Sequence, residues 1–298
     1  MKSLKGLFQL TRPVNAFICG LSVFCGAILG GNPFTRTTEF LALFSFQTSL
    51  HINMWQVRTL SGVLSASLIL AAGNVFNDVR DLKTDRINTP HRPIPSGMVS
   101  LPAAMMFALV LAVSGLILSL PLGLWGIAVA LFAVVTLAAY DILLKGVPLA
   151  GNTAVAGLAG LTFIYGGIAG HAVERSVLPA VFAFLFHLGR ELLKDAADME
   201  GDRSADIKTA ATVWGKEPSC RTAAALLMAL AVITISPFTF GYFGFGYFVI
   251  IALGVWPVLI YSSVSALRNP SENNLRMIST ILKIDMPVGI VAVIVGFM

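Results

Sequence analysis

The chain has few charged residues and few cysteines, and each shortage excludes a class of protein. Only 12% of its 298 residues are charged, whereas 56% are hydrophobic and the mean hydropathy is +0.83. A soluble domain is about 25% charged, so this chain lacks the polar side chains to cover a water-facing surface. That composition excludes a disordered chain and predicts a polytopic membrane protein. The three cysteines match neither a zinc site nor an even set of disulfides.

Long apolar runs fill most of the chain. A bilayer core of about 30 Å requires about 20 apolar residues in a helix. Backbone groups in lipid must bond to one another, so the runs are expected to be helical. We predict an all-α fold, with one domain over residues 1–298 that forms a bundle of nine transmembrane helices around a central cavity. The predicted spans are residues 13–30, 58–77, 101–119, 124–143, 150–170, 177–194, 219–237, 244–266 and 281–298.

The positive charges indicate an orientation. If the N-terminus is cytoplasmic, nine spans leave only Arg36, Arg58 and Arg175 of the 20 Lys and Arg residues on the outer side. This bias follows the positive-inside rule. We therefore expect a cell (inner) membrane protein with a cytoplasmic N-terminus, and the net charge of +5 requires no nucleic-acid partner. Residues 31–57 are predicted to form an outer, interfacial segment, for which a structural role is favoured over a functional one.

A short acidic motif occurs twice. Residues 78–86 read DVRDLKTDR and residues 195–203 read DAADMEGDR, so three aspartates and an arginine recur 117 positions later. At about 100° per residue, the three aspartates of each copy share an arc of about 60° if the helix continues. Asn74 and Glu191, also 117 positions apart, fall in the same arc. Each copy follows an apolar span, which places both at the cytoplasmic boundary.

Carboxylates crowded on one face repel one another, and a divalent cation relieves that repulsion. Mg²⁺ prefers oxygen ligands and commonly binds through a few carboxylates together with substrate phosphates. Two such faces across a cavity would hold Mg²⁺ bridged to a diphosphate. For either copy alone, solvated loop ends joined by salt bridges are an equal alternative, but the shared register favours the metal. The predicted ligands are Asn74, Asn77, Asp78, Asp81, Asp85, Asp195, Asp198 and Asp202.

Cationic side chains flank both motifs. Arg92 lies on a proline-rich loop after the first copy, Arg190 and Lys194 precede the second copy, and Lys208 follows it. Such groups are suited to bind the oxygens of a diphosphate and to neutralise it as it leaves. For each residue singly, the alternative is an anchor at the membrane surface. A metal role for the nearby histidines is disfavoured, because no second nitrogen or thiolate ligand stands at a matching spacing.

These segments together resemble the UbiA superfamily of intramembrane prenyltransferases. The resemblance lies in residues 77–85 (NDVRDLKTD), residues 92–97 (RPIPSG), residues 194–202 (KDAADMEGD) and residues 11–13 (TRP). It implies nine helices, with both motifs on the cytoplasmic side after the second and sixth. It also implies that Mg²⁺ and a prenyl diphosphate are bound by Asn77, Asp81, Asp85, Asp198 and Asp202, the four aspartates being catalytic. By the same resemblance, Lys145 is a diphosphate contact.

The resemblance further implies Mg²⁺-dependent transfer of an isoprenyl group from its diphosphate to a lipophilic acceptor. Residues 189–203 are most similar to the geranylgeranyltransferases that act on a prenylglycerol phosphate in ether-lipid synthesis. Chlorophyll synthases and the aryl prenyltransferases of quinone synthesis stay open as alternatives. A divalent-cation transporter is the non-enzyme alternative, although its ligands would lie near the bilayer midplane. The sequence does not identify a general base.

Overall fold

The computed structural model describes residues 2–30 and 54–298, and helices form most of this part. No strand occurs in it, which agrees with the predicted all-α fold. The expected outer segment lies outside the described residues, except for residues 54–57, which begin a helix. The α-helices are α1 (Lys2–Leu10), α2 (Pro13–Gly30), α4 (Met54–Arg80), α5 (Leu82–Asn88), α6 (Leu101–Leu118), α7 (Gly123–Ala139), α8 (Ala150–Gly170), α9 (Val177–Ser204), α10 (Ala210–Trp214), α11 (Lys216–Ile233), α12 (Ser236–Thr239), α13 (Phe245–Ile250), α14 (Trp256–Arg268) and α15 (Glu272–Phe297).

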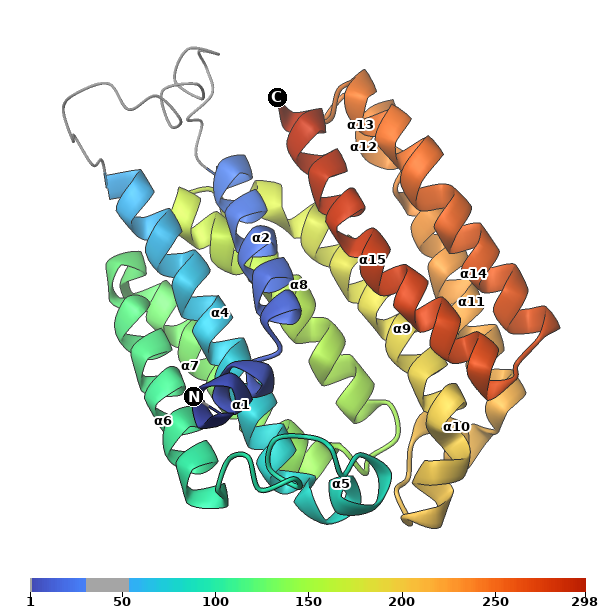
Figure 1. Cartoon of the computed structure of the whole chain (residues 1–298). Helices are drawn as coiled ribbons and strands as arrows, with labels where there is room; N and C mark the ends of the chain where they lie inside the picture. The colour runs from blue at the N-terminus through green and yellow to red at the C-terminus, as the bar shows by residue number, and fades with distance from the viewer. Residues whose placement is uncertain (1, 31–53) are drawn as a thin grey trace.

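Four shorter elements connect or extend these helices. The 3₁₀ turns η1 (Leu120–Leu122) and η3 (Val173–Ser176) precede α7 and α9, and the π-helical turns η2 (Tyr140–Leu144) and η4 (Ile251–Val255) follow α7 and α13. The long helices lie side by side as roughly aligned rods, with α2 and α8 between α4 and α9 (Figure 1). The short helices α5 and α10 lie together at one end of the bundle, the lower end in Figure 1.

Eight helical stretches of the described chain are long and apolar enough to cross a membrane. One of them, Leu101–Leu144, contains two of the predicted spans, because α6 and α7 are separated by the turn η1. Arg58, near the start of α4, donates to the carbonyl of Pro121 in this turn at 2.9 Å. Lys145, which follows α7, contacts Asp81 just beyond the end of α4 at 2.6 Å. The chain from η1 to Lys145 thus runs the length of α4, so the stretch Leu101–Leu144 contains two helices that lie along the bundle. The predicted count of nine spans is therefore approximate.

The predicted spans differ from the helices chiefly at their polar ends. The spans 13–30 and 150–170 coincide with α2 and α8, whereas α9 continues ten residues past its predicted end and α15 begins nine residues earlier than predicted. An apolar run stops where charged residues begin, but backbone hydrogen bonds continue the helix into the aqueous boundary. The extension of α9 carries the whole second acidic motif.

Small residues bring the central helices into close contact. A Cβ atom added to Gly26 of α2 would lie 2.2 Å from the carbonyl oxygen of Phe163 in α8, and one added to Gly166 would lie 2.1 Å from the carbonyl oxygen of Val23. Helices that approach this closely pack backbone against backbone, as is common in membranes. The pair α2 and α8 therefore forms a tight centre for the bundle.

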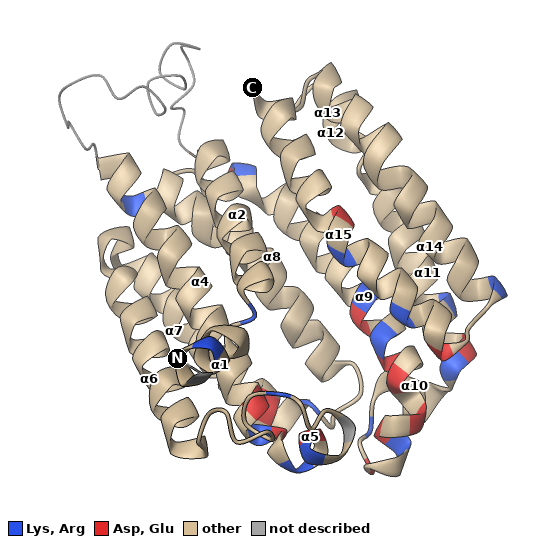
Figure 2. Ribbon diagram, viewed as in Figure 1, with Lys and Arg blue, Asp and Glu red and all other residues tan. Residues whose placement is uncertain are grey.

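Charge is distributed unevenly over the molecule. Most charged residues gather at the end of the bundle that carries α5 and α10 (Figure 2). The outward faces of α6 and α7 instead expose large apolar side chains such as Leu109, Val110 and Phe132. A surface of this kind suits lipid, which confirms the predicted membrane protein.

Candidate active site

The first acidic motif spans a helix break. The helix α4 ends at Arg80, Asp81 lies in the turn, and α5 begins at Leu82. The amide of Asp81 still donates to Asn77 O at 2.9 Å, and that of Asp85 to Asp81 O at 2.8 Å. Backbone hydrogen bonds of the helical type therefore continue through the motif, but its three aspartates do not lie on one regular helix.

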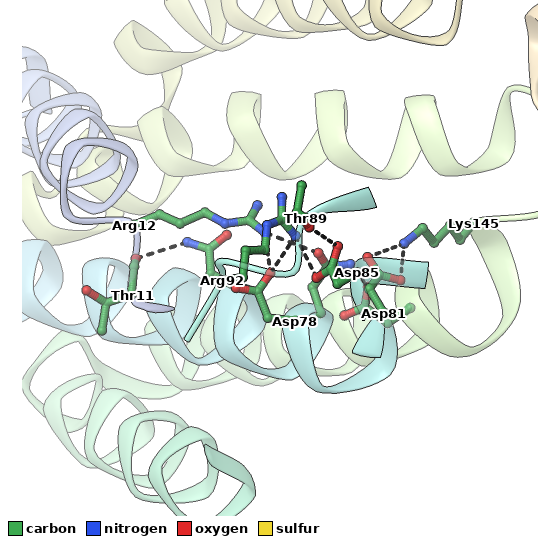
Figure 3. Close-up of polar contacts among 11 residues, drawn as sticks. Thr11, Arg12, Asp78, Asp81, Asp85, Thr89, Arg92 and Lys145 are labelled. Atoms are coloured by element: carbon green, nitrogen blue, oxygen red, sulfur yellow. Dashed lines mark hydrogen bonds and ion pairs between the residues drawn. The ribbon is translucent and has the colours of Figure 1, made fainter. Parts of the chain in front are cut away.

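Two arginines, one from the turn before α2 and one from the loop after α5, bind the first and last aspartates of this motif (Figure 3). Arg12 Nη2 donates to Asp78 Oδ1 at 2.6 Å, and Arg92 Nη1 donates to Asp85 Oδ2 at 2.8 Å and to Asp78 Oδ1 at 3.5 Å. Asp78 and Asp85 are both buried. A buried carboxylate needs such partners, so these contacts fold the loop of Arg92 back onto the motif.

Arg12 is a site residue whose role the sequence did not reveal. It lies between α1 and α2 with a φ of +49°, a left-handed conformation that is unusual for a residue with a side chain. Besides Asp78, its Nη2 reaches Asn77 Oδ1 at 3.3 Å. The neighbouring carbonyl of Thr11 accepts a hydrogen bond from Asn74 Nδ2 at 3.1 Å. The turn before α2 is thus held against the end of α4.

Asp81 points away from the arginines and pairs with Lys145 (Figure 3). Lys145 Nζ lies 2.6 Å from Asp81 Oδ2 and follows the π-helical turn η2. In the same turn, Asp141 accepts a hydrogen bond from Asn77 Nδ2 at 2.6 Å. The turn between α7 and α8 therefore supplies both a cation and a carboxylate to the first motif, and Asp141 had no sequence signal.

The second acidic motif lies on the uninterrupted helix α9. Asp195 Oδ2 accepts a hydrogen bond from Asn152 Nδ2 of α8 at 2.9 Å, and Asp198 Oδ1 pairs with Arg276 Nη2 of α15 at 2.6 Å. One turn earlier, buried Glu191 accepts from Arg190 Nη1 at 3.1 Å and from Lys194 Nζ at 2.7 Å. Two of the predicted phosphate-binding cations are therefore paired with a carboxylate of their own helix.

One cavity of about 840 Å³ joins residues of the two motifs. Its wall includes Asn77 and Asp81 from the first copy and Asp198 from the second. The predicted site residues that line it are Asn74, Asn77, Asp81, Arg92, Lys145, Arg190, Lys194 and Asp198. The predicted site residues that do not line it are Asp78, Asp85, Asp195, Asp202 and Lys208. The structure thus brings the two copies to one site, but through fewer side chains than the repeat predicts.

Apolar residues line the cavity away from this polar end. One apolar wall is formed by residues of α4 and α7 such as Ile69 and Val129, and another by residues of α9, η4 and α15 such as Phe186, Ile251 and Val293. A polar end continuous with such walls suits an amphiphile that has a charged head and a hydrocarbon tail.

The oxygen donors of the site fit Mg²⁺ by their chemistry. In the part of the chain that the structure describes, no three Asp, Glu, His or Cys side chains are grouped to hold a metal ion. Asp81 and Asp198 are each paired with a cation instead. Because Mg²⁺ usually binds through one or two carboxylates plus substrate phosphates, this donor set fits a metal that shares its ligands with a diphosphate.

Comparison with known proteins identifies the family of the chain. The sequence pattern of the UbiA prenyltransferase family matches residues 37–284. The chain belongs to the UbiA prenyltransferase family. It is therefore a prenyltransferase, and the predicted resemblance to this family is confirmed.

Several relatives match over nearly the whole chain. The digeranylgeranylglyceryl phosphate synthase of Sulfolobus acidocaldarius is 34% identical over 260 residues, covering 87% of this chain and 86% of that protein. The synthase of the same name from Saccharolobus solfataricus is 33% identical over 300 residues, covering 99% and 97%.

Solved structures show the same fold. A structure described as giving insight into digeranylgeranylglyceryl phosphate synthase in membranes superposes with a TM-score of 0.75 at 29% identity, covering 100% of this chain and 99% of that one. A UbiA homologue from Archaeoglobus fulgidus bound to GPP and Mg²⁺ superposes with a TM-score of 0.64 at 16% identity, covering 97% and 99%.

Proposed function

We propose that this prenyltransferase moves a geranylgeranyl group from its diphosphate to the hydroxyl group of a prenylglycerol phosphate, in the synthesis of an ether lipid. One observation carries the proposal. The cavity places oxygen donors of both acidic motifs beside cations at one end and apolar walls beyond them, as a prenyl diphosphate requires. The names of the relatives, which match nearly the whole chain, support the acceptor class.

Asn77, Asp81 and Asp198, which line the cavity, are the residues that would hold Mg²⁺, and the family resemblance adds Asp85 and Asp202, which do not line it. When bound, the metal supplies positive charge to the diphosphate oxygens. Asn74, Asp78 and Asp195, which we had expected among the ligands, receive a different role. Their side chains bond to Thr11, Arg12 and Asn152, so we assign them to positioning the helices that carry the site.

The cations of the cavity stabilise the leaving group. As the allylic carbon–oxygen bond breaks, the diphosphate takes the electron pair and gains negative charge. Arg92, Lys145, Arg190 and Lys194 line the polar end and would bind its oxygens. Lys208 does not line the cavity, and we place it outside the site. The apolar walls exclude water, which would otherwise hydrolyse the allylic cation.

We further propose that the site lies on the cytoplasmic side of the inner membrane. We also propose that residues 1–298 form a single domain. The charged end of the bundle carries the N-terminal helix, both motifs and most of the cations (Figure 2). The positive-inside rule assigns such an end to the cytoplasmic side. Both substrates carry long apolar chains and would enter from the surrounding lipid.

Purified protein tests the proposal. We would incubate it with radiolabelled geranylgeranyl diphosphate, with and without Mg²⁺, against a prenylglycerol phosphate, an aromatic quinone precursor and a chlorophyllide. The expected result is a labelled ether lipid with the first acceptor alone, lost when EDTA removes the metal. Product with the aromatic acceptor or the chlorophyllide instead would reject the proposed acceptor.

A further inference from the structure

Asp285 lies in the middle of α15, and its carboxylate has no partner among the described residues. The residue is 6% exposed, and its Oδ2 is buried without a hydrogen bond to any described residue. Figure 2 shows α15 as a largely uncharged rod with one acidic and one basic segment in its middle. An unpaired buried carboxylate destabilises the folded state, so folding gives no reason to keep it. An ionisable residue within a membrane span points to function.

The other acids of the cavity are all engaged. Five acidic residues of the described chain line it. Four accept a hydrogen bond or ion pair: Asp81 from Lys145, Asp141 from Asn77, Glu191 from Arg190 and Lys194, and Asp198 from Arg276. Asp285 is the fifth. The cavity therefore contains one carboxylate whose lone pairs are left for a ligand.

Asp285 lies between the charged end of the cavity and its apolar wall. Arg190 Nε donates to Ser279 O at 3.1 Å, and Lys283, further along α15, also lines the cavity. Asp285 lies six residues beyond Ser279 and two beyond Lys283, about 9 Å and about 3 Å deeper at 1.5 Å per residue. Ile290 and Val293 continue the wall beyond it. A diphosphate held at the charged end directs its tail past this level, so the carbon that reacts lies toward Asp285.

We propose that Asp285 accepts the proton of the acceptor's hydroxyl group; the proposal rests on the function proposed above. The bond from the allylic carbon to the diphosphate breaks, and the acceptor oxygen then bonds to that carbon. The diphosphate keeps the electron pair of the broken bond. The acceptor's O–H bond breaks in turn, and its proton passes to the carboxylate of Asp285. Each bond and charge is then accounted for without another reactant.

Other side chains of the cavity are less suited to this task. The hydroxyl group of Tyr247 donates to Thr234 O at 2.7 Å, so its proton is committed to the fold. His187 also lines the cavity, but its ring packs edge-on against Phe186 with the centroids 6.0 Å apart. Among the acids that line the cavity, Asp285 is the one that combines a buried, unpaired acceptor atom with a position near the charged end.

The test compares Asp285→Asn, Asp285→Glu and the wild-type protein. Asparagine has nearly the same shape but does not take up the proton, so the kcat for prenyl transfer should fall by about 100- to 10,000-fold. The KM for geranylgeranyl diphosphate should stay within about threefold, because donor binding does not use this side chain. Asp285→Glu keeps a carboxylate and should recover at least about tenfold over Asp285→Asn. Glu217→Gln on α11 is the matched control, since Glu217 is exposed and pairs only with exposed Arg221 among the described residues.

A wild-type kcat in Asp285→Asn, or Asp285→Glu no better than Asp285→Asn, would overturn the proposal for Asp285. Thermal unfolding of both variants in detergent guards against misfolding, and Asp285→Asn is expected to be at least as stable as wild type. If the wild-type protein itself prenylates only an aromatic carbon, the proposed function fails first, and the role of Asp285 fails with it.

Discussion

The two acidic motifs share a spacing but differ in the partners that the fold gives them. In the first copy, each of the three aspartates is paired with a cation: Asp78 and Asp81 with residues more than 60 positions away, and Asp85 with Arg92 in the loop that follows. In the second copy, Asp195 is held by the amide of Asn152 and Asp198 by the largely exposed Arg276. The first copy also crosses a helix break, whereas the second lies on one continuous helix. An internal repeat thus preserves the donor atoms without preserving their surroundings.

Among changes to the two motifs and their partners, removing one cavity-lining carboxylate from either copy should cause the largest loss of activity. We expect Asp81→Ala and Asp198→Ala each to lower kcat/KM for prenyl transfer by about 100- to 1,000-fold, the usual effect of deleting one electrostatic contact to a developing charge. Steady-state assays with labelled donor measure this. Glu200→Ala, an exposed acid on α9, is the control and should stay near the wild type. Equal activity in Asp198→Ala and wild type would show that only the first copy is used.

Arg12→Ala should destabilise the protein more than any change among the second copy's partners. It leaves the buried carboxylate of Asp78 with only the longer contact to Arg92. We expect a loss of about 2 kcal/mol in the free energy of unfolding, the cost of an unsatisfied buried group. Thermal unfolding in detergent measures it. Adding Asp78→Asn should restore part of the loss, and no restoration would contradict the pairing as its cause.

Lys145→Ala and Arg276→Ala test whether the two ion pairs are equivalent. Lys145 lines the cavity, whereas Arg276 does not and its side chain is 58% exposed. We expect Lys145→Ala to raise the KM for the donor about tenfold, which corresponds to about 1.4 kcal/mol. Arg276→Ala should change it by less than about threefold, as for an exposed ion pair. Equal effects in the donor titration would show that both cations bind diphosphate.

Asn152→Ala should have the smallest effect. It removes the 2.9 Å hydrogen bond to Asp195, which joins α8 to α9 behind the cavity. We expect a loss of about 1 kcal/mol in stability, the typical net value of one hydrogen bond, with kcat nearly unchanged. A large loss of activity with unchanged thermal stability would contradict the positioning role and indicate that Asp195 binds the metal.

Much of the fold could be predicted because the bilayer imposes length and polarity on each helix. The spans of α2 and α8 agree with the structure to the residue, and most other ends differ by a few residues. The larger errors, at the end of α9 and the start of α15, arose where helices continue into charged sequence. The break at Asp81 was also missed, because the residues around it show no proline or glycine that would predict it.

The candidate site was predicted in its residue types rather than in its contacts. Asp81, Asp198, Arg92 and Lys145 were named from sequence and line the cavity. Arg12 was noted only within a family segment, although its guanidinium reaches a carboxylate 66 positions away. Asp141 and Arg276 gave no signal at all. Pairs of this kind depend on which helices pack together, which a linear pattern does not contain.

By itself, the sequence determined a helical membrane protein with two equivalent acidic motifs at one boundary, because composition and periodicity act locally along the chain. Tertiary structure alone decided which acids line the cavity, which cation pairs with each, and that Asp285 lines the cavity with no partner among the described residues. The physical reason is that a carboxylate's role is set by the charges and donors within a few ångströms of it, and here several of those groups lie far apart in sequence.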